Sequence, residues 1–223
     1  MNSPKIAPSI MCANFKCLRN DIDALNEAKC EYLHFDIMDG TFVPNFTLGP
    51  NVMHHVREMS NIPFDIHLMV MRPEEHLHRF DIKENDYVSF HAEACFHIER
   101  TLKTINDTYG AKSMLALNPA TPLNVIDYVI DSLDAILLMT VNPGYAGQNL
   151  IPSTLNKIAD LRRLLAERGR DDIEIEVDGN VSFENAKLMR KRGADIFVAG
   201  SSSVFDKNYN ITEATEKLRE CIS

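Results

Sequence analysis

The chain has 223 residues, of which 45% are hydrophobic and 25% are charged, and its formal net charge is −9. That length suits one α/β barrel, and the hydrophobic share is ample for a sizeable core. The acidic balance argues against a nucleic-acid or anionic-membrane partner, because both need clustered lysine and arginine. It still allows a small anionic substrate, which backbone amides alone can hold.

The cysteines and the N-terminal sequence indicate the compartment. The chain has five cysteines, an odd number, without a Cys-x-x-Cys pair, so neither a disulfide framework nor a thiolate zinc site is predicted. Strand-like sequence begins by Ile6, which leaves no room for a signal peptide, and no apolar run approaches membrane-spanning length. We therefore expect a protein of the reducing cytoplasm.

Short apolar runs rich in β-branched residues alternate with helical patterns along the chain. We predict strands over residues 6–10, 32–38, 64–70, 86–91, 112–118, 135–141, 173–178 and 195–199. We predict helices over residues 15–29, 51–59, 71–80, 97–109, 123–130, 154–168, 183–192 and 211–221. Eight such repeats predict right-handed crossovers and one (β/α)8 TIM barrel spanning residues 1–223. The alternative, a doubly wound open sheet, usually has fewer strands and a glycine-rich first turn, unlike residues 9–14.

Polar side chains follow the predicted strands at the end where barrel enzymes place their active sites. If the second, third and seventh strands surround one lumen, two imidazoles and two carboxylates can share one divalent ion. These four residues are His34, Asp36, His67 and Asp178. A lone strand histidine is more often structural, but unpaired buried carboxylates are costly, so four together favour a metal site. Mixed nitrogen and oxygen ligands suit Zn²⁺, Fe²⁺, Mn²⁺ or Co²⁺.

Strand parity places further acidic side chains near this site. Glu174 and Glu176 alternate with Asp178, so all three should face the lumen. Glu176 is the candidate for orienting a metal-bound imidazole, with a buried structural role as the alternative.

Glycine-containing loops after predicted strands 6, 7 and 8 have the pattern of a phosphate cradle. Barrel enzymes often bind phosphate at loops 7 and 8, through backbone N–H groups and a helix N-terminus. These loops contain no lysine or arginine, which fits a cradle of neutral amides, although each alone would be an ordinary turn. The candidate residues are Gly144, Tyr145, Ala146, Gly147, Gly179, Asn180, Gly200 and Ser201.

Seven ordered motifs between residue 6 and about residue 205 point to a known family. They are Ala7-Pro-Ser-Ile10, the segment 34–45 (His-Phe-Asp-Ile-Met-Asp-Gly-Thr-Phe-Val-Pro-Asn), His67-Leu-Met69, Leu117-Asn-Pro-Ala-Thr-Pro122, the segment 139–148 (Met-Thr-Val-Asn-Pro-Gly-Tyr-Ala-Gly-Gln), Glu176-Val-Asp-Gly179 and Ala199-Gly-Ser201. On these residues the chain resembles the ribulose-phosphate 3-epimerase family. The resemblance implies a metal-dependent TIM barrel that inverts C3 of a phosphorylated ketose, converting D-ribulose 5-phosphate to D-xylulose 5-phosphate. It also implies a homo-oligomer.

The resemblance assigns roles to individual residues. The family's acid/base aspartates match Asp36 and Asp178, which would act on opposite faces of a planar enediolate, one removing a proton and the other donating one. A ketose C–H is too weak an acid for a carboxylate alone, and a cation would stabilise the enediolate. The substrate contacts implied are Ser9, His67, Met38, Met69 and Met139. The alternatives are an ST-turn for the serine and ordinary core packing for the methionines.

The chain departs from the usual family pattern in several loops. Gly144-Tyr-Ala-Gly147 replaces Gly-Phe-Gly-Gly, Asp178-Gly-Asn180 replaces Asp-Gly-Gly, and Ser201-Ser-Ser-Val-Phe205 replaces Ser-Ala-Ile-Phe. Ile10-Met-Cys12, Thr140 and Ala146 are more similar to the branch acting on D-allulose 6-phosphate, whereas Asn142 favours the pentose. Both substrates therefore stay open.

Two other functions were weighed against the epimerase. A decarboxylase or aldolase of the related barrels would have Asp-x-Lys on a strand, where this chain has Asp36-Ile-Met-Asp39. A non-catalytic sugar-phosphate-binding barrel has no need for two proton carriers, so the pair Asp36 and Asp178 counts against it.

Overall fold

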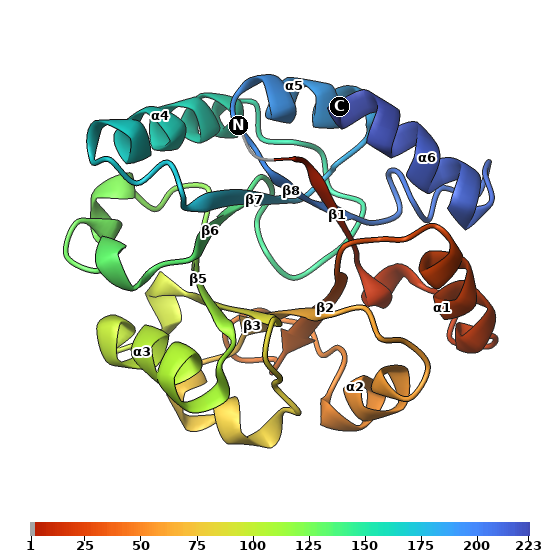
Figure 1. Ribbon diagram of the computed structural model, residues 1–223, viewed down its shortest axis with the longest axis horizontal. Coiled ribbons are helices and arrows are strands. Elements are labelled where there is room, and N and C mark those ends of the chain that lie inside the picture. The colour runs from red at the N-terminus through yellow and green to blue at the C-terminus, as the bar shows by residue number, and fades with distance from the viewer. Residues whose placement is uncertain (1–2) are drawn as a thin grey trace.

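Eight parallel strands form a ring at the centre of the computed structural model, which describes residues 3–223 (Figure 1). They are β1 (Lys5–Pro8), β2 (Leu33–Met38), β3 (Phe64–Met69), β4 (Tyr87–His91), β5 (Lys112–Leu117), β6 (Ala135–Met139), β7 (Glu174–Asp178) and β8 (Ile196–Ala199). The strands pair in the order β1-β8-β7-β6-β5-β4-β3-β2. A parallel bridge between Ser9 and His34 links β1 back to β2. The predicted TIM barrel is confirmed, and no strand begins more than one residue outside its predicted range.

Helices cover the outside of this ring (Figure 1). The α-helices of residues 3–223 are α1 (Leu18–Glu27), α2 (Pro50–Arg57), α3 (Ile98–Tyr109), α4 (Ser153–Glu167), α5 (Phe183–Lys191) and α6 (Ile211–Ile222). Each buries an apolar stripe against the sheet, as α4 does with Ile158, Leu161 and Leu165. The ends of these helices are set locally: α6 begins with a capping box between Asn210 and Glu213.

Two predicted helices are wrong in type. Residues 71–80 contain the 3₁₀ turns η2 (Pro73–Glu75) and η3 (Leu77–Arg79), and the segment predicted as 123–130 contains η5 (Leu123–Ile126), followed by η6 (Ile130–Ser132). Each of these turns fully buries no more than one side chain. A helix of this length is stabilised mainly by a buried stripe of apolar side chains. One buried side chain stabilises only a short 3₁₀ turn.

The strands separate two packed layers. Their outward side chains meet the helices in the main core, while Tyr32, Tyr87, Met114 and Leu137 fill the lumen. Glu174 also faces the lumen, as parity predicted, and accepts hydrogen bonds from Lys5 Nζ at 2.6 Å and Tyr87 Oη at 2.5 Å. The lumen is therefore filled at the end where β7 begins, and the polar cluster described below lies toward the strands' carboxyl ends.

Within residues 3–223, no helix combines the length and the apolar character needed to cross a bilayer.

Candidate active site and metal centre

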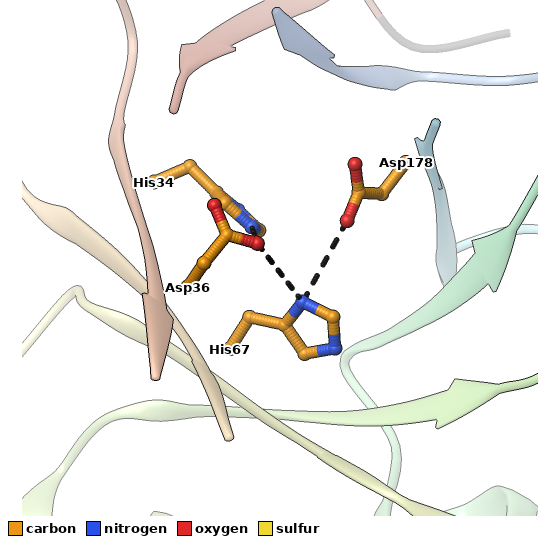
Figure 2. A group of neighbouring side chains, drawn as sticks. All are labelled: His34, Asp36, His67 and Asp178. Atoms are coloured by element: carbon orange, nitrogen blue, oxygen red, sulfur yellow. Dashed lines mark ion pairs between the residues drawn. The ribbon is translucent and has the colours of Figure 1, made fainter. Parts of the chain in front are cut away.

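Four polar side chains converge at the carboxyl end of the barrel (Figure 2). One nitrogen or carboxylate oxygen of each lies within 4.8 Å of the corresponding atoms of the others: His34, Asp36, His67 and Asp178. His34 Nε2 is 3.5 Å from Asp36 Oδ1, and His67 Nδ1 is 3.8 Å from the same oxygen. His67 Nδ1 is also 3.7 Å from Asp178 Oδ2. The structure thus brings together the residues predicted to share a cation.

Strand register explains this convergence. Asp36 on β2 lies opposite His67 on β3, so the two side chains leave the sheet at one level and on one face. His34 precedes Asp36 by two residues and shares its face. Asp178 is the last residue of β7, where a barrel strand delivers its side chain to the mouth.

Two buried ring nitrogens test whether this cluster fits a metal ion. His34 Nε2 and His67 Nδ1 have no hydrogen-bond partner, although both rings are completely buried. These are also the nitrogens that face the carboxylates. Burying an unpaired polar atom costs free energy, and a cation placed among the four side chains would satisfy both lone pairs. The donor set of two nitrogens and two carboxylates therefore fits a divalent transition metal.

A buried aspartate orients His34. Nδ1 of His34 is 2.5 Å from Asp65 Oδ2, and Asp65 is completely buried on β3. Asp65 is not among the residues predicted from the sequence, where Glu176 is the candidate for this role. Glu176 Oε1 is 3.8 Å from His34 Nδ1, and neither of its carboxylate oxygens is hydrogen-bonded. The signal that could have found Asp65 was its parity with His67, two residues later.

His67 contacts a second histidine that the sequence analysis also missed. Its Nε2 lies 2.9 Å from Nε2 of His91, the last residue of β4. His91 Nδ1 in turn lies 3.3 Å from Glu93 Oε2. Position in the C-terminal half of a predicted strand, the signal that singled out His67, would have marked His91 as well.

A cavity with about 560 Å³ of empty space, part of it open to solvent, lies above the cluster. Asp36 and Asp178 form part of its wall, and Ser9 Oγ donates a 2.5 Å hydrogen bond to Asp36 Oδ2. The predicted substrate contacts that line the cavity are Ser9, Met38, Met69, Met139, Gly144, Tyr145, Ala146, Gly147, Gly179, Asn180, Gly200 and Ser201. His67, also predicted as a substrate contact, is not in the wall.

The loop after β7 needs its glycine. Gly179 has φ +120°, and a Cβ there would lie 2.6 Å from Val141 Cγ2 and 2.8 Å from Val141 N. Asn180 follows with φ 49° and donates through Nδ2 to Gln148 O at 2.6 Å. Among residues 3–223, no lysine or arginine lines the cavity, so backbone amides are the available anion donors.

The loop after β6 closes one side of the cavity by binding the loop after β2. The Tyr145 hydroxyl donates to Pro44 O at 2.6 Å, and Asn45 Nδ2 donates to Gly144 O at 2.8 Å. Tyr145 is nevertheless 53% exposed, so this contact lies at the rim.

The side chains give the two candidate catalytic carboxyls opposite pKa shifts. Burial acts to raise the pKa of Asp36, but His34 and His67 outweigh it and hold that pKa well below its usual range. Burial and the charge of Asp36 raise the pKa of Asp178 to about 7. Burial acts to lower the pKa of His34, but Asp65 and Asp36 raise it well above its ordinary value. One ionised carboxyl beside one that holds a proton near neutral pH is the pattern of a base and an acid.

Comparison with known proteins gives consistent sequence matches. The profile of the ribulose-phosphate 3 epimerase family matches residues 5–205. Ribulose-phosphate 3-epimerase of Bacillus subtilis is 45% identical over 198 residues, covering 89% of this chain and 91% of the relative. The enzyme of that name from Escherichia coli is 45% identical over 203 residues, covering 91% and 89%. Ribulose-5-phosphate-3-epimerase, chloroplastic, of Arabidopsis thaliana is 43% identical over 206 residues, covering 92% and 73%.

Solved structures share the fold at much lower identity. The 3-keto-L-gulonate-6-phosphate decarboxylase of Vibrio cholerae superposes with a TM-score of 0.65 at 14% identity, covering 99% of this chain and 98% of the other. A 3-hexulose-6-phosphate synthase gives 0.67 at 12% identity, covering 98% and 100%. At this level of identity, the similarity shows a shared barrel fold only.

Proposed function

The chain belongs to the ribulose-phosphate 3-epimerase family, and we propose on this premise that it interconverts D-ribulose 5-phosphate and D-xylulose 5-phosphate by inverting C3. The observation that carries the proposal is the placement of Asp36 and Asp178 together at the base of one cavity, with unpaired nitrogens of His34 and His67 beside them. Inversion needs a proton removed from one face of C3 and another delivered to the opposite face. The two carboxyl groups that line the cavity, those of Asp36 and Asp178, provide the two proton carriers.

Asp36 on β2 and Asp178 at the end of β7 can divide the labour between them: one accepts the C3 proton and the other delivers a proton to the opposite face. In the reverse reaction the roles exchange. Ser9 holds Oδ2 of Asp36 and so limits the rotation of the proton-accepting group.

The four converging side chains His34, Asp36, His67 and Asp178 would hold one divalent ion, with Zn²⁺, Fe²⁺, Mn²⁺ and Co²⁺ as candidates. When bound, it would stabilise the negative charge that develops on the substrate's C2 and C3 oxygens. Met38, Met69 and Met139 line the cavity beside the acids and exclude water from the reacting carbon. We assign the phosphate to the loops after β6, β7 and β8, whose backbone amides surround one side of the cavity.

The pentose is the proposed substrate because the relatives reported above carry the ribulose-phosphate name. Steady-state kcat/KM on D-ribulose 5-phosphate beside D-allulose 6-phosphate tests this choice. A higher kcat/KM for the hexose phosphate would reassign the substrate and leave the C3 chemistry in place.

Replacing one proton carrier should separate exchange from inversion. In Asp178→Asn, Asp36 can still remove and return a proton on its own face, but nothing delivers one to the other face. We expect kcat for epimerisation to fall by roughly a thousandfold or more, while C3 of one epimer still exchanges with solvent deuterium at a measurable rate.

The assay is NMR of the substrate in D₂O. The protein is supplied with a Zn²⁺ or Co²⁺ salt that contains no Mn²⁺, and circular dichroism verifies folding. Near-normal inversion by Asp178→Asn would refute the two-base mechanism. Wild-type protein that neither exchanges nor inverts C3 would instead favour a non-catalytic binding barrel.

We further propose a reducing, cytoplasmic setting and a homo-oligomer. All five cysteines are free, which supports the first proposal. The second proposal follows from the resemblance to the ribulose-phosphate 3-epimerase family. Sedimentation velocity of the purified chain measures the assembly state directly.

A further inference from the structure

A series of contacting side chains leads away from the candidate cation site and the cavity, from His67 to His91 and then to Glu93. We propose that His91 and Glu93 are positioning residues that keep His67 in the tautomer whose Nδ1 lone pair faces the cation, an inference that rests on the proposed metal site. Neither residue lines the cavity, so neither is a candidate for contact with the substrate. Their effect would pass through the contacts of Glu93 with His91 and of His91 with His67.

The first link is the contact between two imidazole rings. His67 Nδ1 faces Asp36 and Asp178, so a cation there requires this nitrogen to be unprotonated and the ring proton to sit on Nε2. That Nε2 lies 2.9 Å from His91 Nε2. At this distance one of the two nitrogens must donate and the other accept. His67 is therefore the donor, and His91 must present a lone pair at Nε2.

The second link fixes the proton of His91. A neutral imidazole that accepts at Nε2 carries its proton on Nδ1, and the buried His91 Nδ1, which has no hydrogen-bond partner, lies within ion-pair distance of Glu93 Oε2, at 3.3 Å. A carboxylate only accepts, so it favours an N–H pointing at it over a ring lone pair. The ring of Phe42 packs on His91 with centroids 4.6 Å apart, which limits rotation of the imidazole.

The third link holds Glu93 itself. Its Oε1 accepts hydrogen bonds from the Asn118 backbone N–H, at 3.0 Å, and from the Thr121 hydroxyl. Oε1 is thus occupied, and Oε2 remains for His91. Lys157 Nζ donates to Asn118 O at 2.7 Å and so steadies the loop after β5 that supplies these donors. The two oxygens of Glu93 therefore have different partners, and this makes an isosteric substitution informative.

Glu93→Gln should place a donor instead of an acceptor opposite His91 Nδ1, with almost no change in the volume of the side chain. The amide oxygen will take the Oε1 position, because Asn118 and Thr121 both donate there. The amide NH₂ then faces His91 Nδ1 and donates to it, so the proton of His91 moves to Nε2. Two N–H groups would now oppose each other unless His67 shifts its own proton to Nδ1, where the cation must bind.

The first test measures the affinity of the metal-free full-length chain for Zn²⁺ by competition with a chromophoric chelator. We expect Glu93→Gln to raise the Kd by roughly 10- to 100-fold, the usual effect of removing a residue that orients a metal-bound histidine. The matched control is Glu58→Gln, because Glu58 also faces a histidine, His54 at 3.6 Å, but at the exposed C-terminal end of α2. The control should bind Zn²⁺ within twofold of wild type.

The second test needs no substitution and stands even if Glu93→Gln fails to fold. In Zn²⁺-loaded wild-type protein labelled with ¹⁵N-histidine, long-range ¹H–¹⁵N correlation spectra report which ring nitrogen carries the proton. We expect His91 to be protonated on Nδ1 and His67 on Nε2, a signature that a purely structural role for Glu93 does not require.

Two outcomes overturn the inference: a His91 proton on Nε2, or a Kd for Glu93→Gln within twofold of wild type. Wild-type protein that binds no divalent ion at micromolar concentration would instead overturn the metal site itself, and with it the proposed mechanism. The two failures are therefore distinguishable.

Discussion

At the scale of single residues, the site consists of buried groups, and the protonation state of each depends on the charges of its neighbours. His34 and Asp36 follow from strand parity, His67 from its place in the C-terminal half of a strand and Asp178 from its place at a strand end, so the sequence was sufficient to propose the four. The partner of His34 was not predictable in the same way. Asp65 and Glu176 both have the right parity, and which of them meets His34 depends on the relative stagger of β2, β3 and β7, which no local pattern encodes.

Cation binding should be tighter at high pH. The pKa of Asp178 is raised to about 7 and that of His34 is also raised, so both groups hold protons in neutral solution that a cation must displace. Affinity should therefore fall as pH drops below 7, by about tenfold per pH unit for each proton released. Calorimetric titration with Zn²⁺ at pH 6 and pH 8, in buffers of different ionisation enthalpy, measures the affinity and the proton count.

Asp178→Asn provides the comparison for this pH dependence. It removes one titrating group, so its affinity should depend less steeply on pH than that of the wild type. Equal affinity of the wild-type protein at pH 6 and pH 8 would contradict the assignment of these residues as ligands.

At the scale of elements, apolar periodicity predicted all eight strands, because a buried strand and a surface helix repeat with different periods. It failed at residues 71–80 and 123–130, where apolar side chains at helical spacing sit in 3₁₀ turns. Periodicity reports which faces are apolar, but whether a segment has a neighbour long enough to bury a full stripe depends on the packing of the whole barrel. Contacts between loops, such as that of Tyr145 with Pro44, leave no periodic signal.

Tyr145→Phe should weaken closure of the cavity without touching the acids. The change removes the hydrogen bond to Pro44 O but keeps the ring, and the contact between Asn45 and Gly144 remains. Loss of one such bond predicts a roughly two- to tenfold rise in KM with kcat nearly unchanged. The control is Tyr128→Phe, at a side chain that is 95% exposed. Steady-state kinetics of both variants decide the matter, and an unchanged KM for Tyr145→Phe would show that the contact does not hold the loop.

At the scale of the whole molecule, three of the proposed ligands come from β2 and β3 and the fourth comes from β7, so a bound cation bridges distant parts of the chain. A ligand that binds only the folded state stabilises it by mass action, by about 2.7 kcal/mol at one hundred times its Kd. Because 1 kcal/mol corresponds to roughly 2–4 °C in Tm for a domain of this size, Zn²⁺ at that excess should raise Tm by about 5–11 °C.

Differential scanning calorimetry with and without EDTA measures this shift. The double variant Asp36→Asn and Asp178→Asn should lose most of it, because it replaces both anionic ligands by neutral amides. A Tm of the wild-type chain that does not respond to the metal would mean that the cluster does not bind the ion in the folded state.

The wide separation of these ligands has a consequence for biosynthesis. His34, Asp36 and His67 leave the ribosome early, whereas Asp178 is translated more than a hundred residues later, and β8 must still emerge to pair with β1. A nascent polypeptide can thus offer only an incomplete set of donors until Asp178 has emerged. We therefore expect cation binding at the proposed site to follow synthesis of the barrel, so that the ion bound is one available to the folded protein.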